Sequence, residues 1–303
     1  MVIEKISSNY QTDSIQKNIQ INNSSTVNFT SNKNDTVEIS NSSNKKEESI
    51  VSTYLKKYLN FIGHLIGSIP QREQLKEKID FKEAKTIDEA VNFGKENLGI
   101  KNYKGFTEAD LDVLNWINEG LVKVSNIQKG NVAMPKKIVF EDLSNGNDAQ
   151  INGYGTMSIN RKTINDTKTE FERLTGKNLP YKEIRVLLEQ NIKNKIININ
   201  FTRYLGCFSD ISHEMGHYQH NANLGALYGV LLLSSNHNIN MPGECSELIN
   251  LFKNSKNVPS KVSEYATTSP MEFVAECYAK MIDGIKLDDD VMQLYIKLGG
   301  VII

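Results

Sequence analysis

The chain has few cysteines, almost no net charge and no long apolar run. Its three cysteines, Cys207, Cys245 and Cys277, are an odd number at no metal-ligand spacing. We therefore expect buried free thiols and no disulfide framework. The 35 basic residues nearly balance the 36 acidic ones, so no net field attracts nucleic acid or an anionic membrane surface. Nucleic acid is accordingly not an expected partner.

Signals for membrane insertion and secretion are also missing. The longest apolar run, residues 224–233, contains glycine and is too short to span a bilayer. The amino terminus lacks the basic and apolar regions of a Sec signal peptide. We expect no membrane span, and a chain that is cytoplasmic or leaves the cell by a non-Sec route. The 303 residues, 39% of them hydrophobic, are enough for one large domain or a domain with an appendage.

Composition and periodicity divide the chain into three regions. Residues 1–48 are rich in Asn, Ser, Thr, Lys and Gln, and bury too little apolar area to offset the entropy of ordering, so we expect a disordered leader. Residues 49–130 show helical spacing from Ile50 onward and helix starts at Thr86 and Thr107, which predicts a helical appendage. Residues 131–303 form the third region, which carries the motifs.

The third region predicts an α+β fold that is mainly helical. Strands are expected at 138–140, 150–160 and 196–201, with helices at 168–174 and 181–191 between the last two. A run of helices is expected to follow and to reach the end of the chain. Residues 153–159 alternate as an edge strand does, and such an edge can pair with an extended peptide. Candidate substrate-binding residues are Gly153, Tyr154, Gly155 and Thr156. An ordinary edge strand without a ligand remains the alternative.

The most informative motif is His213-Glu214-Met215-Gly216-His217. Two histidines four residues apart on a helix lie about 40° apart on one face, so both can bind one metal ion. Glu214 between them can reach a metal-bound water but not the metal. With three fixed residues, the pattern arises by chance in roughly one chain of this size in a hundred. A third ligand is therefore needed to support a metal site.

A second segment offers that ligand. Pro270 suits the first turn of a helix, on which Glu272 and Glu276 lie four residues apart on one face. One carboxylate can bind the metal while the other hydrogen-bonds a ligand histidine. Residues 269–272 also form a capping box, in which Glu272 only caps its own helix. Beside the histidine motif we favour Glu272 as the ligand. Rival carboxylates are Glu244, Glu247 and Glu264.

The remaining histidines fit the metal site less well. His220 lies seven residues after His213, about 10 Å further along a helix axis, which is too far to share a tetrahedral ion. We expect it at the rim of the cleft. His64 lies off the apolar face of its predicted helix and His237 lies in a polar run, so a surface and a loop position are expected.

Together, HEMGH at 213–217 and EFVAE at 272–276, with Tyr265 seven residues before Glu272, resemble the gluzincins. The arrangement looks like that of the anthrax lethal factor catalytic domain and of the clostridial Pro-Pro endopeptidases. It implies one zinc ion held by His213, His217 and Glu272, with Glu276 bonded to a ligand. It further implies Glu214 as general base, Tyr265 as electrophile, and a zincin-like catalytic domain over 131–303, with an edge strand over the motif helix and a helical C-terminal subdomain.

The resemblance implies a zinc-dependent endopeptidase that hydrolyses peptide bonds in a protein or extended peptide. In this mechanism Glu214 activates a zinc-bound water. No obligate partner besides the substrate is expected. A catalytically silent zincin-fold protein, such as a binding or phage-head-associated protein, is the alternative. A toxin or effector would carry the same residues as an intracellular processing enzyme, so the motifs leave that choice open.

Overall fold

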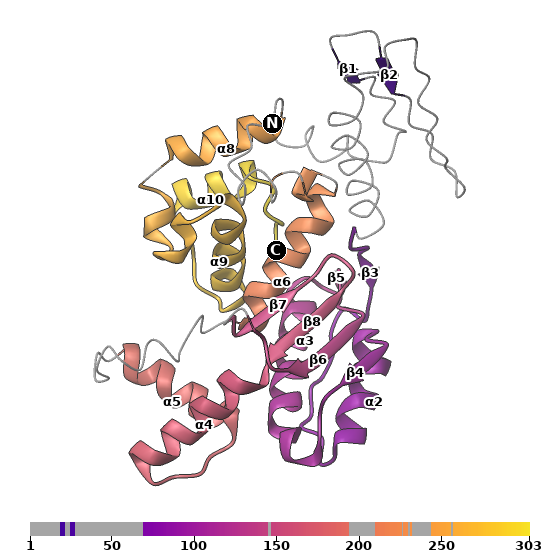
Figure 1. The fold of residues 1–303 in the computed structure, drawn as a ribbon, viewed down its shortest axis with the longest axis vertical. Helices are drawn as coiled ribbons and strands as arrows, with labels where there is room; N and C mark the ends of the chain where they lie inside the picture. The colour runs from indigo at the N-terminus through magenta and orange to yellow at the C-terminus, as the bar shows by residue number, and fades with distance from the viewer. Residues whose placement is uncertain are drawn as a thin grey trace, which may run out of the picture. The chain divides into compact units, whose positions relative to one another are not determined.

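The computed structural model describes residues 19–21, 25–27, 69–144, 147–193, 210–225, 227–229, 231, 244–255 and 257–303 (Figure 1). The chain forms two units, Met1–Leu59 and Asn60–Ile303. In the first, β1 (Ile19–Ile21) pairs antiparallel with β2 (Ser25–Val27). The rest of the predicted leader, the helix predicted from Ile50, the strand at 196–201, His64, Cys207 and His237 lie outside the described residues.

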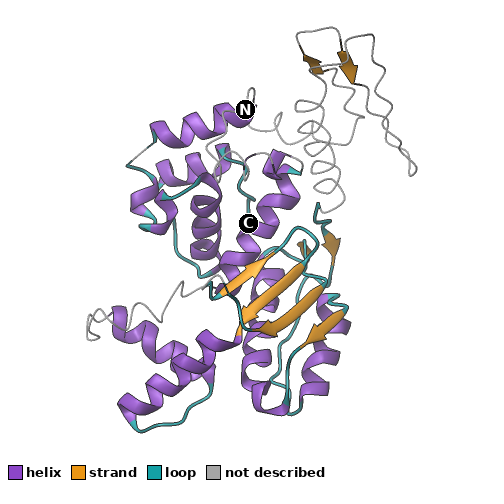
Figure 2. Ribbon diagram, in the orientation of Figure 1, coloured by secondary structure: helices purple, strands orange, loops and turns teal. Residues whose placement is uncertain are grey.

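A four-stranded mixed sheet occupies the first half of the second unit (Figure 2). Its order is β4 (Asn102–Lys104), β6 (Lys137–Glu141), β8 (Thr156–Asn160) and β7 (Ala149–Ile151). The first three strands are parallel, and β7 pairs antiparallel with β8. Consecutive residues of β6 and β8 are buried, as is typical of strands covered on both faces. A separate pair joins β3 (Glu73–Gln74) to β5 (Asn131–Val132).

The edge strand predicted at 153–159 is wrong. Thr156 begins β8, which lies between β6 and β7, and residues 153–155 form the turn that precedes it. Gly155 in this turn has φ +80°, a conformation that glycine adopts without strain. The glycines at 153 and 155 are a turn signal, and the prediction extended one strand across them. The edge strands of the sheet are β4 and β7.

The predicted helices are present in the described part of the chain. Thr86 caps α2 (Ile87–Leu98) by accepting from the Glu89 N–H, and Gly99 ends that helix in a left-handed conformation. The helix expected from Thr107 begins as η2 (Glu108–Asp110) and continues as α3 (Leu111–Ile127). The others are α4 (Arg161–Thr175), α5 (Tyr181–Lys193), α6 (Asp210–Leu224), α8 (Glu244–Asn254), η4 (Pro259–Lys261), η5 (Tyr265–Thr267), α9 (Pro270–Ile282) and α10 (Asp289–Lys297).

Described residues before 130 are not an appendage. β4 belongs to the main sheet, α3 packs against α6 and α9, and residues 60–303 form one unit. One hydrophobic core contains Ile117 and Leu121 of α3 together with Met215 of α6 and Phe273 of α9. The apolar stripe of α3 was recognised in the sequence, but not the partner that buries it. The expected domain boundary at residue 130 is therefore wrong.

The structure bears on two further expectations. Cys245 and Cys277 are buried and are not in a disulfide, as predicted. Among the described residues, every helix is too short or too polar to cross a bilayer. The fold is α+β and mainly helical, as predicted.

Candidate metal centre

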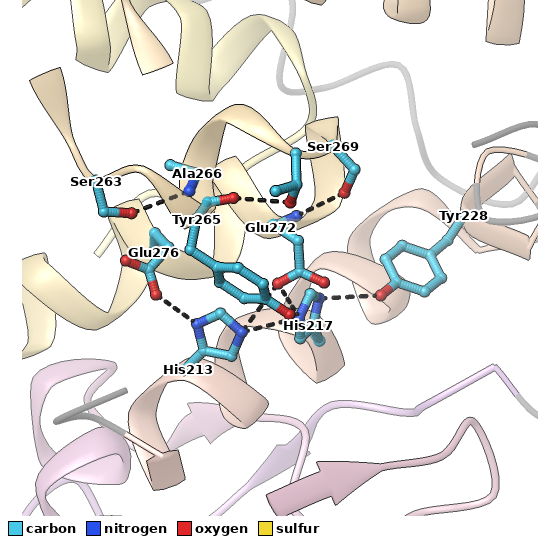
Figure 3. A network of polar contacts seen from close by, with 10 residues as sticks. His213, His217, Tyr228, Ser263, Tyr265, Ala266, Ser269, Glu272 and Glu276 are labelled. Carbon is cyan, nitrogen blue, oxygen red and sulfur yellow. Dashed lines mark hydrogen bonds and ion pairs between the residues drawn. The ribbon is translucent and has the colours of Figure 1, made fainter. Parts of the chain in front are cut away.

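Two small residues let the helices that carry the motifs, α6 and α9, approach closely. A Cβ added to Gly216 would lie 2.8 Å from the Ala275 Cα and 3.1 Å from the Ala275 carbonyl oxygen. No side chain fits there, so Gly216 allows backbone contact between the helices. Gly216 belongs to the motif at 213–217 and Ala275 to the motif at 272–276. The two motifs therefore face each other across this contact (Figure 3).

The contact brings His213, His217 and Glu272 together. The two Nε2 atoms are 3.1 Å apart, and each is 3.1 Å from Glu272 Oε2. Three ligands of a tetrahedral zinc ion with bonds of about 2.0–2.1 Å lie about 3.3 Å from one another. Within the described ranges, this is the group of His, Cys, Asp and Glu side chains that could hold a metal ion. The rivals Glu244, Glu247 and Glu264 are not part of it.

The donor atoms themselves fit a cation. Two imidazole nitrogens and a carboxylate oxygen in mutual contact present lone pairs to one point, and two neutral imidazoles cannot satisfy all three contacts by hydrogen bonds. Glu272 is also part of the cap of α9, because its N–H donates to the Ser269 hydroxyl at 3.1 Å. The cap uses the backbone of Glu272 and leaves its carboxylate to the histidines. Of the two roles considered from the sequence for the Glu272 side chain, the structure shows contact with the histidines.

Both histidines are held from outside the cluster. His213 Nδ1 lies 2.9 Å from Glu276 Oε1, and His217 Nδ1 lies 3.3 Å from the Tyr228 hydroxyl (Figure 3). Glu276 thus takes the position expected from the sequence. Tyr228 was not foreseen: it follows the glycine that ends α6, and no recognised spacing relates it to His217.

The histidines and carboxylates of the cluster shift one another's pKa values. Burial opposes protonation of His213, but hydrogen bonds to Glu272 and Glu276 outweigh it and raise the pKa of His213 to about 10. Burial likewise opposes ionisation of the two carboxyls, yet the hydrogen bonds with His213 hold the pKa of Glu272 and of Glu276 below the ordinary value. Without metal, the cluster therefore holds protons that a cation must displace.

Glu214 lies on α6 beside the edge strand. Burial raises the pKa of its carboxyl, while His217, His213 and the backbone N–H of Ile151 oppose that rise. Ile151 is the last residue of the edge strand β7, so the carboxylate of Glu214 lies close both to the ligand histidines and to this strand. A carboxylate with a raised pKa in this position can accept a proton from a water molecule near the ligands.

Tyr265, the first residue of η5, lies over the cluster. Its ring centroid is 5.8 Å from that of His213, and 47% of the residue is exposed. The ring therefore faces both the ligands and the solvent side, where a bound molecule could meet it (Figure 3). Gly153, Tyr154, Gly155 and Thr156 lie at the turn into β8, and Tyr154 is 58% exposed.

His220 does not line a cleft. It is fully buried, its Nε2 donates to the Leu298 carbonyl at 2.8 Å, and burial lowers its pKa to about 4. Asn223, one turn further along α6, donates to the Gly299 carbonyl at 2.9 Å. The chain after α10 thus covers this part of α6. The rim position expected for His220 is wrong, because nothing in the sequence showed where the C-terminal segment packs.

Comparison with known proteins gives no relative. The sequence matches no protein-family model and no curated protein, and the fold matches no solved structure. The residues and geometry of the site are therefore what indicates a function.

Proposed function

We propose that the protein is a zinc-dependent endopeptidase that hydrolyses peptide bonds in a protein or extended peptide. The observation that carries the proposal is the contact of His213, His217 and Glu272, whose facing atoms are 3.1 Å apart, with Glu214 beside the edge strand β7. The overall arrangement, a mixed sheet with an antiparallel edge strand next to the motif helix, supports a zincin-like fold.

The ligand set favours zinc. Two imidazoles and one carboxylate are the ligands of several hydrolytic zinc sites, in which a fourth position stays open. Imidazole also suits copper, iron and nickel, so the preference for zinc comes from the combination with a carboxylate base in reach. When bound, zinc supplies Lewis acidity to water and to the scissile carbonyl group.

The protein's own groups supply proton transfer and charge stabilisation. Glu214 accepts a proton from the attacking water and returns it to the leaving amine. Its raised pKa brings the carboxyl closer to the pH at which such transfers are efficient. The Tyr265 hydroxyl donates to the oxyanion that develops on the scissile carbonyl. The exposure of Tyr265 supports this role, because the ring is accessible to a substrate.

Among the described residues, no further strand pairs with β7, so its outer edge is the proposed place for an extended substrate. The backbone N–H of Asn152 donates to the Thr156 carbonyl, and that of Asn160 donates to the Asp148 carbonyl. Because inward and outward peptide groups alternate in an antiparallel pair, those of Ala149 and Ile151 point away from β8, and on this side the Ile151 N–H bonds Glu214. A peptide that adds there as a strand passes Glu214. The proposed substrate contact thus moves from residues 153–156 to β7.

A cleavage assay tests the proposal. Purified protein is incubated with a proteome-derived peptide library, with and without a chelator, and after zinc is restored. We expect specific cleavage that the chelator abolishes and zinc restores, and no cleavage by Glu214→Gln. Stoichiometric zinc without any cleavage would instead favour a catalytically silent zincin-fold protein.

A further inference from the structure

The two ligand histidines have different outer partners. Both turn Nε2 toward the cluster and Nδ1 away from it. On His213, Nδ1 meets a carboxylate, Glu276, at 2.9 Å. On His217, Nδ1 meets a neutral hydroxyl, that of Tyr228, at 3.3 Å (Figure 3).

Tyr228 is brought back to α6 by a turn. The helix ends at Leu224, and Gly225 follows with φ +58°, a left-handed conformation that favours glycine. The Tyr228 N–H donates to the Gly225 carbonyl at 3.1 Å. The ring then packs edge-on to buried His220, with centroids 5.2 Å apart. Ring packing thus fixes the position of the hydroxyl.

We infer that Tyr228 is a positioning residue for the metal ligand His217. A metal at Nε2 requires the remaining proton of the neutral ring on Nδ1, where it can donate to the Tyr228 oxygen. This hydrogen bond selects the tautomer that can bind metal and fixes the orientation of the ring. Tyr228 contacts the nitrogen that faces away from the cluster, so it is neither a ligand nor a group that touches substrate.

The neutral partner suits a crowded acidic site. Glu214, Glu272 and Glu276 already place three carboxyls around the two histidines. A second outer carboxylate would add a fourth negative charge to this group of side chains. A phenol orients His217 without that charge. The inference rests on the proposed zinc site and specifies how one of its ligands is held.

Zinc affinity is the first test. Tyr228→Phe removes only the hydroxyl, and by competition with a chromogenic chelator we expect zinc binding about 10- to 100-fold weaker. Tyr295→Phe is the matched control, since it removes a buried hydroxyl that donates to the Val301 carbonyl at 2.7 Å, away from the site. It should keep wild-type zinc affinity. Unchanged affinity in Tyr228→Phe, or an equal loss in both variants, overturns the inference.

Histidine NMR provides a readout that a general structural role would not move. In zinc-loaded protein labelled with ¹⁵N-histidine, the Nδ1 proton of His217 should exchange slowly with water. In the Tyr228→Phe variant the same proton should exchange faster. The Nδ1–H of His213, held by Glu276, serves as the internal reference and should not change. Equal exchange of the His217 proton in both proteins overturns the inference while leaving the proposed function intact. Wild-type protein that binds no zinc overturns both.

Discussion

Three histidines on α6 lie in two different environments. His213 and His217 meet a carboxylate and each other, whereas His220, less than one turn further along, is sealed under the C-terminal segment. The surroundings shift the pKa values in opposite directions, to about 10 for His213 and to about 4 for His220. Spacing along the helix keeps His220 too far from His213 to share its ion. What packs against each ring decides the surroundings and the pKa of each histidine.

Loss of the third ligand should have the largest effect. Glu272→Ala removes the carboxylate that joins the two histidines from α9, so we expect loss of stoichiometric zinc and of all cleavage. Zinc content after dialysis, measured by atomic absorption, checks this. Glu264→Ala is the matched control and should retain zinc. If Glu264→Ala or Glu247→Ala releases zinc while Glu272→Ala keeps it, the third ligand has been misassigned.

Glu214→Gln should separate metal binding from catalysis. The amide keeps the shape of the side chain but cannot accept the proton, so turnover should fall to near background while zinc remains bound. Parallel measurement of kcat and of zinc content distinguishes the two effects. Cleavage at the wild-type rate by a zinc-loaded variant would remove Glu214 from the mechanism.

A smaller loss is expected from Tyr265→Phe. This substitution removes one hydroxyl from a half-exposed ring next to His213. As a donor to the oxyanion, that hydroxyl should contribute roughly 10²- to 10³-fold, mainly in kcat. Steady-state kinetics on one peptide, with the melting temperature as a folding control, measures it. An effect on KM alone would indicate a binding role instead.

The smallest expected effect concerns the pH dependence of stability in metal-free protein. Because the pKa of His213 is raised on folding, protonated His213 stabilises the fold. This contribution is complete below pH 6.5, the ordinary pKa, and is lost as pH rises toward about 10. The depressed pKa of His220 acts in the opposite sense: its contribution is complete above 6.5 and is lost as pH falls toward about 4. Melting temperatures of chelator-treated protein across this range should fall on both sides.

His220→Leu checks the assignment of the acid side. It removes a group that must be neutral when buried, so the decline below pH 6.5 should become shallower. The variant also leaves the Leu298 carbonyl without its donor, which should cost about 1–3 kcal/mol at neutral pH. If the melting temperature of the variant declines below pH 6.5 as steeply as that of the wild type, groups other than His220 cause the decline.

The local elements were predictable where a short segment carries its own signal. The start of α2 at Thr86 and its end at Gly99 follow from capping, and α9 begins at Pro270 as predicted. β7 and β4, each three residues long, were not separable from their surroundings in the sequence. Strands this short are recognised by the strands with which they pair. Here the partner is either distant in the sequence or separated by a turn that the prediction did not place.

The sequence by itself determined the helices, the local caps and the presence of two motifs with ligand chemistry, because these depend on residues a few positions apart. Only the tertiary structure decided which groups meet. Contact between Gly216 and Ala275 set Glu272 against the histidines, the turn at Gly225 returned Tyr228 to His217, and the C-terminal segment sealed His220. Such contacts depend on how distant segments fill space together, and no local pattern encodes that.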